Sequence, residues 1–96
     1  IAYSPIALAQ PNGLGENWHY GFGLWNECQV AASAPFTCTA GTRVSSPGAY
    51  GAYPFWDRSK NYFGIVARQG TLGTFPNGIA IERAVRSTVE QWAACP

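Results

Sequence analysis

The chain alternates large apolar residues with small or polar ones in short runs, a period of two that is typical of β-strands. In the first run, from Trp18 to Leu24, every second residue is large and apolar, while Gly21 and Gly23 fall on the opposite face. Alternating glycines leave one face of a strand flat, so that another element can approach it closely. The predicted strands cover residues 18–25, 42–46, 50–56 and 62–68.

Turn residues separate these runs and indicate how the strands connect. The polar residues 57–61 predict a hairpin loop between the last two strands. Pro54 lies inside the third run, and because proline cannot donate a ladder hydrogen bond, we expect an edge position or a bulge there. Residues 1–17 contain a Pro-Asn-Gly sequence and predict a loop.

A helical repeat follows the strands. Residues 77–94 predict a helix with Asn77 as N-cap and an apolar stripe of Ile81, Val85, Val89 and Trp92. We expect this stripe to face the sheet and the pair Glu82 and Arg86 to lie on the polar side. The order of elements predicts an α+β fold, in which residues 18–69 form an antiparallel β-sheet of about four strands with the C-terminal helix packed on one face.

The composition indicates that part of the surface is covered by other protein. Of 96 residues, 47% are hydrophobic and 15% aromatic, but only 11% are charged, against roughly 25% in average globular chains. A chain of this length buries only about 60–65% of its unfolded surface, so many aromatic side chains remain to be covered. We therefore expect residues 1–96 to be part of a larger domain.

Charge and motif content argue against several classes of function. The net charge is +1 and no basic cluster is larger than Arg58 with Lys60, which argues against nucleic-acid binding. No apolar run approaches the roughly 20 residues of a membrane span. No cluster has zinc-ligand spacing and no phosphate loop is present, so we expect no metal and no cofactor. The single histidine, His19, lies in a predicted strand, where a packed side chain is favoured over a catalytic base.

The cysteines indicate an oxidising compartment. Cys28 and Cys38 flank a short loop with turn character, which favours a disulfide over two unrelated buried thiols. Cys95 is left over, and we expect it to pair with another chain or a missing segment. The sequence lacks methionine, so Ile1 is interpreted as a processed or internal start, although signal-peptide removal or an experimental boundary would look the same. These features predict a secreted or extracytoplasmic protein, periplasmic proteins included.

Residues 45–57 are the most informative stretch for chemistry. Ser45 and Ser46 are followed by small residues that leave one strand edge clear of bulk. Glycine at such a place lets a ligand approach the backbone, and the N–H of Ala49 could then donate to an oxyanion. The alternative, which spacing alone favours, is a simple Ser-Pro-Gly turn between two strands.

This stretch resembles the third active-site motif of the serine β-lactamase and D,D-peptidase superfamily, in its esterase and class C-like branch. There the strand reads Lys-Thr-Gly or His/Trp-x-Gly, followed by a small residue, an aromatic-Gly pair and a hairpin Asp. The matching residues here are Ser46-Pro47-Gly48, Ala49, Tyr50-Gly51 and Asp57. Residues 20–25 resemble the preceding Tyr-Gly-Leu-Gly-Trp strand, 61–66 the return strand and 89–92 the C-terminal helix, so the resemblance covers most of residues 18–93.

The departures from the family pattern define what the resemblance implies. Neither the Ser-x-x-Lys nucleophile motif nor the Tyr-x-Asn motif occurs, Ser46 replaces the usual Lys or His, and Pro47 removes a backbone donor. The resemblance implies the C-terminal part of a β-lactamase-like α/β domain that is not catalytic alone. The nucleophile would lie on a preceding segment, expected as the N-terminal chain of the same precursor in a heterodimer, with Cys95 as a possible bridge.

The implied activity is acyl transfer through an acyl-enzyme on a small ester, amide, peptide or β-lactam. The implied catalytic residues are Ala49, through its backbone N–H, and Ser46, while Gly48, Tyr50 and Ser45 would bind substrate. Two alternatives remain open. One is a small secreted carbohydrate- or peptide-binding module that stacks its ligand on Trp18, Trp25, Trp56 and Tyr50. The other is a disulfide-stapled structural protein without a ligand.

Overall fold

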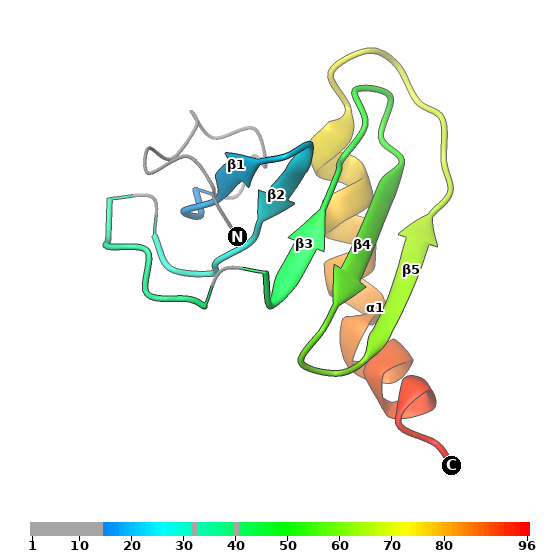
Figure 1. Ribbon diagram of the computed structural model, residues 1–96. Helices are drawn as coiled ribbons and strands as arrows, with labels where there is room; N and C mark the ends of the chain where they lie inside the picture. Colours follow the sequence, from blue (N-terminus) through cyan, green and yellow to red (C-terminus); the bar gives the residue numbers. More distant parts are fainter. Residues whose placement is uncertain (1–14, 32, 40) are drawn as a thin grey trace.

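Five short strands lie side by side in sequence order and form one antiparallel sheet, with a single helix across one of its faces (Figure 1). The computed structural model describes residues 15–31, 33–39 and 41–96, and within them the strands and helix have the following bounds. They are β1 (His19–Gly21), β2 (Leu24–Asn26), β3 (Arg43–Ser45), β4 (Tyr53–Asp57), β5 (Tyr62–Val66) and α1 (Phe75–Ala93). The prediction of an antiparallel α+β fold with a C-terminal helix on one face is confirmed, with five strands where about four were expected. Most of the loop expected over residues 1–17 lies outside the described residues.

The single strand predicted over residues 18–25 is wrong, because the chain reverses at its centre. Phe22 and Gly23 both have positive φ, 52° and 80°, as in the two-residue turns of tight hairpins. Gly21 of β1 therefore pairs with Leu24 of β2. In the sequence the alternation of large and small residues continues through Phe22 and Gly23, although both lie in the turn, and beyond the turn Leu24 shares a face with Gly21 and Trp25 with Tyr20. The period of two therefore did not reveal the reversal.

The expectation that Pro54 marks an edge or a bulge is also wrong. β4 lies between β3 and β5, and its register with β5 is unbroken from Tyr53 to Asp57. The carbonyl of Pro54 accepts a hydrogen bond from the N–H of Ser46, 3.1 Å away, so the proline directs its backbone toward β3. Its missing N–H therefore costs one bond near the end of the β3–β4 ladder, and the ladder to β5 is unaffected.

Helix α1 turns its charged side, not its apolar stripe, toward the sheet. Ile81 and Val85 are exposed, Trp92 is 77% exposed, and Glu82 is only 3% exposed. The predicted packing of the stripe is therefore wrong, although its member Val89 is half-buried. The helix also begins two residues earlier than predicted, with Thr74 as N-cap.

The side of α1 that meets the sheet carries residues at helical spacing, namely Gly78, Ile79, Glu82, Arg83 and Arg86. Glu82 and Arg86 form the predicted pair four residues apart, with Nε 3.0 Å from Oε2, but they lie on this inner side. The apolar core between sheet and helix consists of Trp18, Tyr53, Phe55 and Ile79. Part of the helix is therefore held by charge and part by apolar contact.

Gly78 allows α1 to approach the hairpin between β3 and β4. A Cβ added at Gly78 would collide with the carbonyl oxygen of Gly51 and lie 3.1 Å from the Cβ of Tyr53. The backbone of the helix and the backbone of the hairpin are thus in direct contact at this point.

Gly78→Ala is expected to destabilise the chain by about 1–3 kcal/mol, the usual cost of overpacking. An alanine in place of glycine inside a helix ordinarily stabilises it by about 1 kcal/mol, so the sign of the effect reports the contact with Gly51. Urea unfolding followed by tryptophan fluorescence measures the change. Ser87→Ala on the exposed side of α1 is the control, expected within about 0.5 kcal/mol of the parent. A Gly78→Ala chain more stable than the parent would contradict the close contact.

The predicted disulfide between Cys28 and Cys38 is confirmed, with their Cα atoms 5.7 Å apart. It closes the loop that connects β2 to β3, and an intrachain disulfide indicates an oxidising, extracytoplasmic setting. Cys95 is a free, exposed thiol. Among the described helices, none has the length and apolar character that a membrane span requires.

Candidate functional site

The residues singled out by the sequence lie in the hairpin between β3 and β4. The N–H of Gly48 donates to the carbonyl of Ala52 at 2.8 Å, and the N–H of Gly51 donates to the carbonyl of Gly48 at 2.9 Å. Residues 48–51 therefore form a tight turn, in which Ala49 and Tyr50 are the two central residues. Gly51 has a φ of 101°, a conformation that glycine adopts readily.

This turn is fixed from behind by the segment that leads into α1. The carbonyl of Ala49 accepts hydrogen bonds from the N–H of Gly73 at 2.8 Å and of Thr74 at 3.2 Å. The carbonyl of Tyr50 accepts one from Gly70 at 2.6 Å. In Figure 1 the hairpin tip and the loop between β5 and α1 accordingly lie together.

The N–H of Ala49 stays outside this network. Ala49 is exposed, and within the described chain its N–H donates no hydrogen bond, either to the β-ladder or to the loop. The carbonyl groups on both sides, those of Gly48 and Ala49, are held by hydrogen bonds. The N–H of Tyr50, the other central residue of the turn, likewise donates no hydrogen bond within the described chain, so the turn has two adjacent backbone donors on exposed residues.

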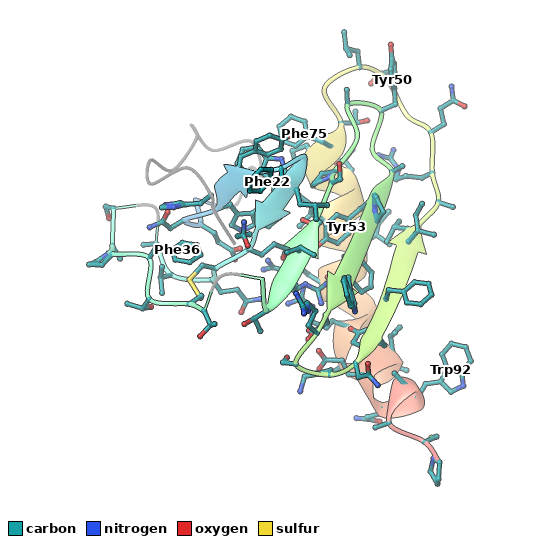
Figure 2. The ribbon with its side chains drawn as sticks, in the orientation of Figure 1. Phe22, Phe36, Tyr50, Tyr53, Phe75 and Trp92 are labelled. Atoms are coloured by element: carbon teal, nitrogen blue, oxygen red, sulfur yellow. A yellow bond between two sulfur atoms is a disulfide. The ribbon has the colours of Figure 1, made fainter. Side chains whose placement is uncertain are left out.

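Four of the five predicted site residues follow one another along this hairpin. Ser46 and Ala49 are exposed, Gly48 is half-buried, and Tyr50 projects at the tip, away from buried Tyr53 (Figure 2). Ser45 differs from them, because its side chain is only 2% exposed and its Oγ has no hydrogen-bond partner among the described residues. It pairs with Trp25 and Phe55 on the side of the sheet that faces α1, so its hydroxyl is not presented to a ligand at the turn.

A shallow cavity of about 220 Å³ adjoins Ser46 on the open face of the sheet, the face that α1 does not cover. Its lining residues include Leu24, Val44, Pro54 and Trp56. Of the predicted site residues, Ser45 and Ser46 line this cavity, whereas Gly48, Ala49 and Tyr50 do not.

Sequence reasoning missed a second feature, a buried group of charges that we call the Arg43 cluster: Arg43, Glu27, Asp57, Glu82 and Tyr53. Nitrogens of the Arg43 guanidinium lie 3.3 Å from Glu27, 3.1 Å from Asp57 and 3.0 Å from Glu82. The Tyr53 hydroxyl donates to the other oxygen of Glu27. Strands β3 and β4, the residue after β2, and helix α1 all contribute, so the cluster joins helix to sheet.

The register of the sheet explains how these groups meet. Arg43 lies directly opposite Asp57 across the β3–β4 ladder. Glu27 donates its N–H to the carbonyl of Arg43 and lies opposite it on the other side. An arginine inside a predicted strand, with acidic residues at the ends of its neighbours, was the available signal. This signal identifies the cluster only when the pairing of the strands is known.

Burial, charges and hydrogen bonds shift the pKa values of Tyr53 and Asp57, two members of the Arg43 cluster. Burial, together with the negative charge of Glu27, raises the pKa of Tyr53 well above its ordinary value. Burial also acts to raise the pKa of Asp57, but hydrogen bonds from Ser59, the Lys60 N–H and Arg43 outweigh it and lower that pKa. Arg43 and Asp57 are therefore charged at neutral pH, and the phenol of Tyr53 is neutral.

A further carboxylate, that of the half-buried Glu16, is held in the same way. Its two oxygens lie 2.8 and 2.9 Å from the guanidinium of Arg83, and Trp18 donates its ring N–H at 3.0 Å. Burial acts to raise the pKa of Glu16, but the hydrogen bonds from Arg83 and Trp18 prevail and lower it.

The chain is expected to lose stability in acid because of these two carboxylates. Their folded pKa values lie below the ordinary values of 4.5 for Glu16 and 3.8 for Asp57, so the unfolded chain binds protons first. Their stabilisation is present above pH 4.5 and is lost as the pH falls through the folded pKa values. Urea midpoints between pH 7 and pH 2.5 measure this.

The variant Glu16→Gln provides the control, because it removes one of the two titrating groups. Its stability should depend less steeply on pH below 4.5 than that of the parent chain. A parent chain with equal urea midpoints at pH 6 and pH 3 would contradict the assignment.

The remaining candidates for chemistry contribute no site of their own. His19 is buried, and its ring centre lies 4.5 Å from that of Phe36, as expected for a packed strand histidine. In the part of the chain that the structure describes, no three His, Cys, Asp or Glu side chains gather to hold a metal ion.

Comparison with known protein families, with characterised proteins and with solved structures finds no match to this chain.

Proposed function

We propose that this chain is the substrate-facing part of a secreted serine hydrolase of the β-lactamase and D,D-peptidase type. In this proposal the Ala49 N–H is one donor of the oxyanion hole, and the nucleophilic serine belongs to a segment outside these 96 residues. The carrying observation is that Ala49 is an exposed residue whose N–H donates no hydrogen bond within the described chain and is flanked by fixed carbonyl groups. Preorganised donors of this kind stabilise negative charge that develops during acyl transfer.

The reaction would proceed through an acyl-enzyme. The external serine loses its proton to the lysine and tyrosine of its own segment and attacks an ester or amide carbonyl. The carbonyl oxygen becomes negative and accepts a hydrogen bond from Ala49. The tetrahedral intermediate then expels the alcohol or amine, which takes up the proton, and water later hydrolyses the acyl-serine. The Ser46 hydroxyl would bond the substrate, Gly48 would leave room for it, and Tyr50 would form a wall.

The fold is consistent with a partner that brings the nucleophile. The face of the sheet opposite α1 carries exposed Leu24, Trp56 and Phe63, which a larger body would cover. Such a body is proposed to be the N-terminal chain of the same precursor, joined through the exposed thiol of Cys95 or by contact alone.

The test uses the protein that contains this chain together with the segment preceding Ile1. A fluorophosphonate probe should label a serine outside residues 1–96, within a Ser-x-x-Lys sequence, and p-nitrophenyl butyrate or nitrocefin should be hydrolysed. The 96-residue chain alone should do neither. A labelled serine inside these residues, or no hydrolysis of any ester, amide or β-lactam, would overturn the proposal.

A binding module based on stacked tryptophans has less support from the side chains. Trp18 is fully buried in the core and Trp25 is packed against it, so neither offers a free ring face. Trp56 is exposed, but the guanidinium of Arg58 lies 4.8 Å from its ring centre. Of the four rings considered, only that of Tyr50 remains exposed without such a contact.

A further inference from the structure

Strand β5 has an open edge. It is the last strand in the sheet order, and among the described residues no strand pairs with its outer side. Because Pro54 directs its backbone toward β3, its neighbours Tyr53 and Phe55 direct theirs toward β5. The backbone groups of their partners Val66 and Gly64 point toward β4. The N–H and C=O groups of Phe63 and Ile65 therefore point outward from the sheet.

This edge lacks the features that protect natural edge strands. Residues 62–66 contain no charge, no proline and no bulge, whereas isolated edges are normally blunted by one of these or covered. Phe63 is 80% exposed and Ile65 is 61% exposed, both on the open face of the sheet. The strand therefore has the character of an interior strand, apolar on both faces.

A groove runs beside the same edge on the helix side. It has a volume of about 400 Å³ and lies between Phe55 and Tyr62 on the sheet and Val89 and Trp92 on α1. Gly64 adds no side chain to its floor, and Trp92 projects beside it near the end of the helix (Figure 2). A strand added to β5 would place alternate side chains in this groove and the others beside Phe63 and Ile65.

Apart from Asp57, which is buried and paired with Tyr62, the charged residues next to β5 along the chain are positive. Arg58 and Lys60 lie in the turn before the strand and Arg68 follows it, and within the described chain none of the three forms an ion pair with a carboxylate. If two copies of this chain paired antiparallel through β5, with Phe63 opposite Ile65, Lys60 of each copy would face Arg68 of the other. Like charges directly opposite one another destabilise a ladder, which disfavours a second copy as the occupant.

We propose that β5 is completed by an extended apolar segment of another polypeptide that carries Asp or Glu at both ends. Backbone hydrogen bonds to Phe63 and Ile65 would supply the pairing, and the carboxylates would meet Lys60 and Arg68. The inference rests on strand register, groove and charge, and is independent of the proposed acyl transfer.

The test uses the 96-residue chain and a synthetic acetylated heptapeptide, Asp-Val-Thr-Val-Thr-Val-Asp, with Lys in place of both Asp residues as the matched control. Amide hydrogen exchange read by NMR should slow about tenfold at Phe63 and Ile65 with the Asp peptide, the effect of about one net hydrogen bond. Gly64, which is already paired with β4, should change little. The Lys peptide should bind more weakly.

Two variants separate backbone pairing from apolar contact. Ile65→Pro removes one outward N–H at an edge position that tolerates proline and should abolish the protection, whereas Ile65→Val keeps the N–H and should retain it. Equal protection by both peptides, protection that survives in Ile65→Pro, or no protection by either peptide would overturn the proposal. A dimer in sedimentation that Ile65→Pro dissociates would also overturn it, in favour of a second copy. Because no hydrolysis is measured, failure here leaves the oxyanion proposal untouched.

Discussion

Arg43→Met is expected to destabilise the chain by about 3–5 kcal/mol, the usual cost of removing one partner from a buried ion pair. Methionine fills much of the same space but removes the guanidinium shared by Glu27, Asp57 and Glu82, so Asp57 loses its ion pair while Glu82 keeps Arg86 and Glu27 keeps only the more distant Arg83. The total stability of a small domain is about 5–15 kcal/mol, so we expect the variant to be largely unfolded at 37 °C. Urea unfolding followed by circular dichroism measures the loss.

Arg58→Met is the matched control, because it removes the same group from an exposed turn. Its guanidinium contacts the ring of Trp56 and forms no ion pair with a carboxylate within the described residues, so the change is expected to stay within about 0.5 kcal/mol of zero. If Arg43→Met also stayed within 1 kcal/mol of the parent, the Arg43 cluster would not be what holds α1 on the sheet.

Ala49→Pro, made in the complete hydrolase proposed above, is expected to lower turnover by about 10²–10³, the effect of removing one oxyanion donor. Ala49 is the second residue of the turn formed by residues 48–51, the position at which proline is favoured. Its N–H takes part in no hydrogen bond within the described chain, so the substitution should leave the free energy of unfolding nearly unchanged. Ester hydrolysis and urea unfolding, measured on the same preparation, separate the two effects.

Ala49→Gly serves as the control, since it keeps the N–H and should retain most of the activity. The loss in Ala49→Pro should fall on kcat rather than on KM, because the oxyanion exists only during the reaction. Unchanged turnover in a folded Ala49→Pro variant would remove Ala49 from the oxyanion role.

The sequence predicted those features that local residues determine. The order of strands and helix, the loop closed by Cys28 and Cys38, and the pairing of Glu82 with Arg86 all follow from spacing along a short stretch. The turn was expected only as the alternative at Ser46-Pro47-Gly48, and the third strand predicted over residues 50–56 begins at Tyr53 instead, because residues 48–51 form the turn. The catalytic role of Ala49 remains a prediction.

The features that the sequence did not predict depend on contacts between distant segments. The inner face of α1 was assigned to its apolar stripe, but the sheet offers Arg43 with Glu27 and Asp57, and a charged helix face meets them more favourably than Ile81 and Val85 would. Pro54 likewise fits inside β4 because its backbone faces β3, and the sequence does not show which neighbouring strand it faces. Neither contact leaves a periodic signal in the sequence.

The burial of most charged side chains also affects how readily copies of the chain associate with one another. Most of its charged side chains lie between sheet and helix, and the two in the exposed class, Arg58 and Lys60, are both in one turn. Elsewhere the described surface consists largely of uncharged and aromatic groups, which provide little electrostatic repulsion between molecules. Salt, which screens what repulsion remains, should therefore favour self-association of the separated chain.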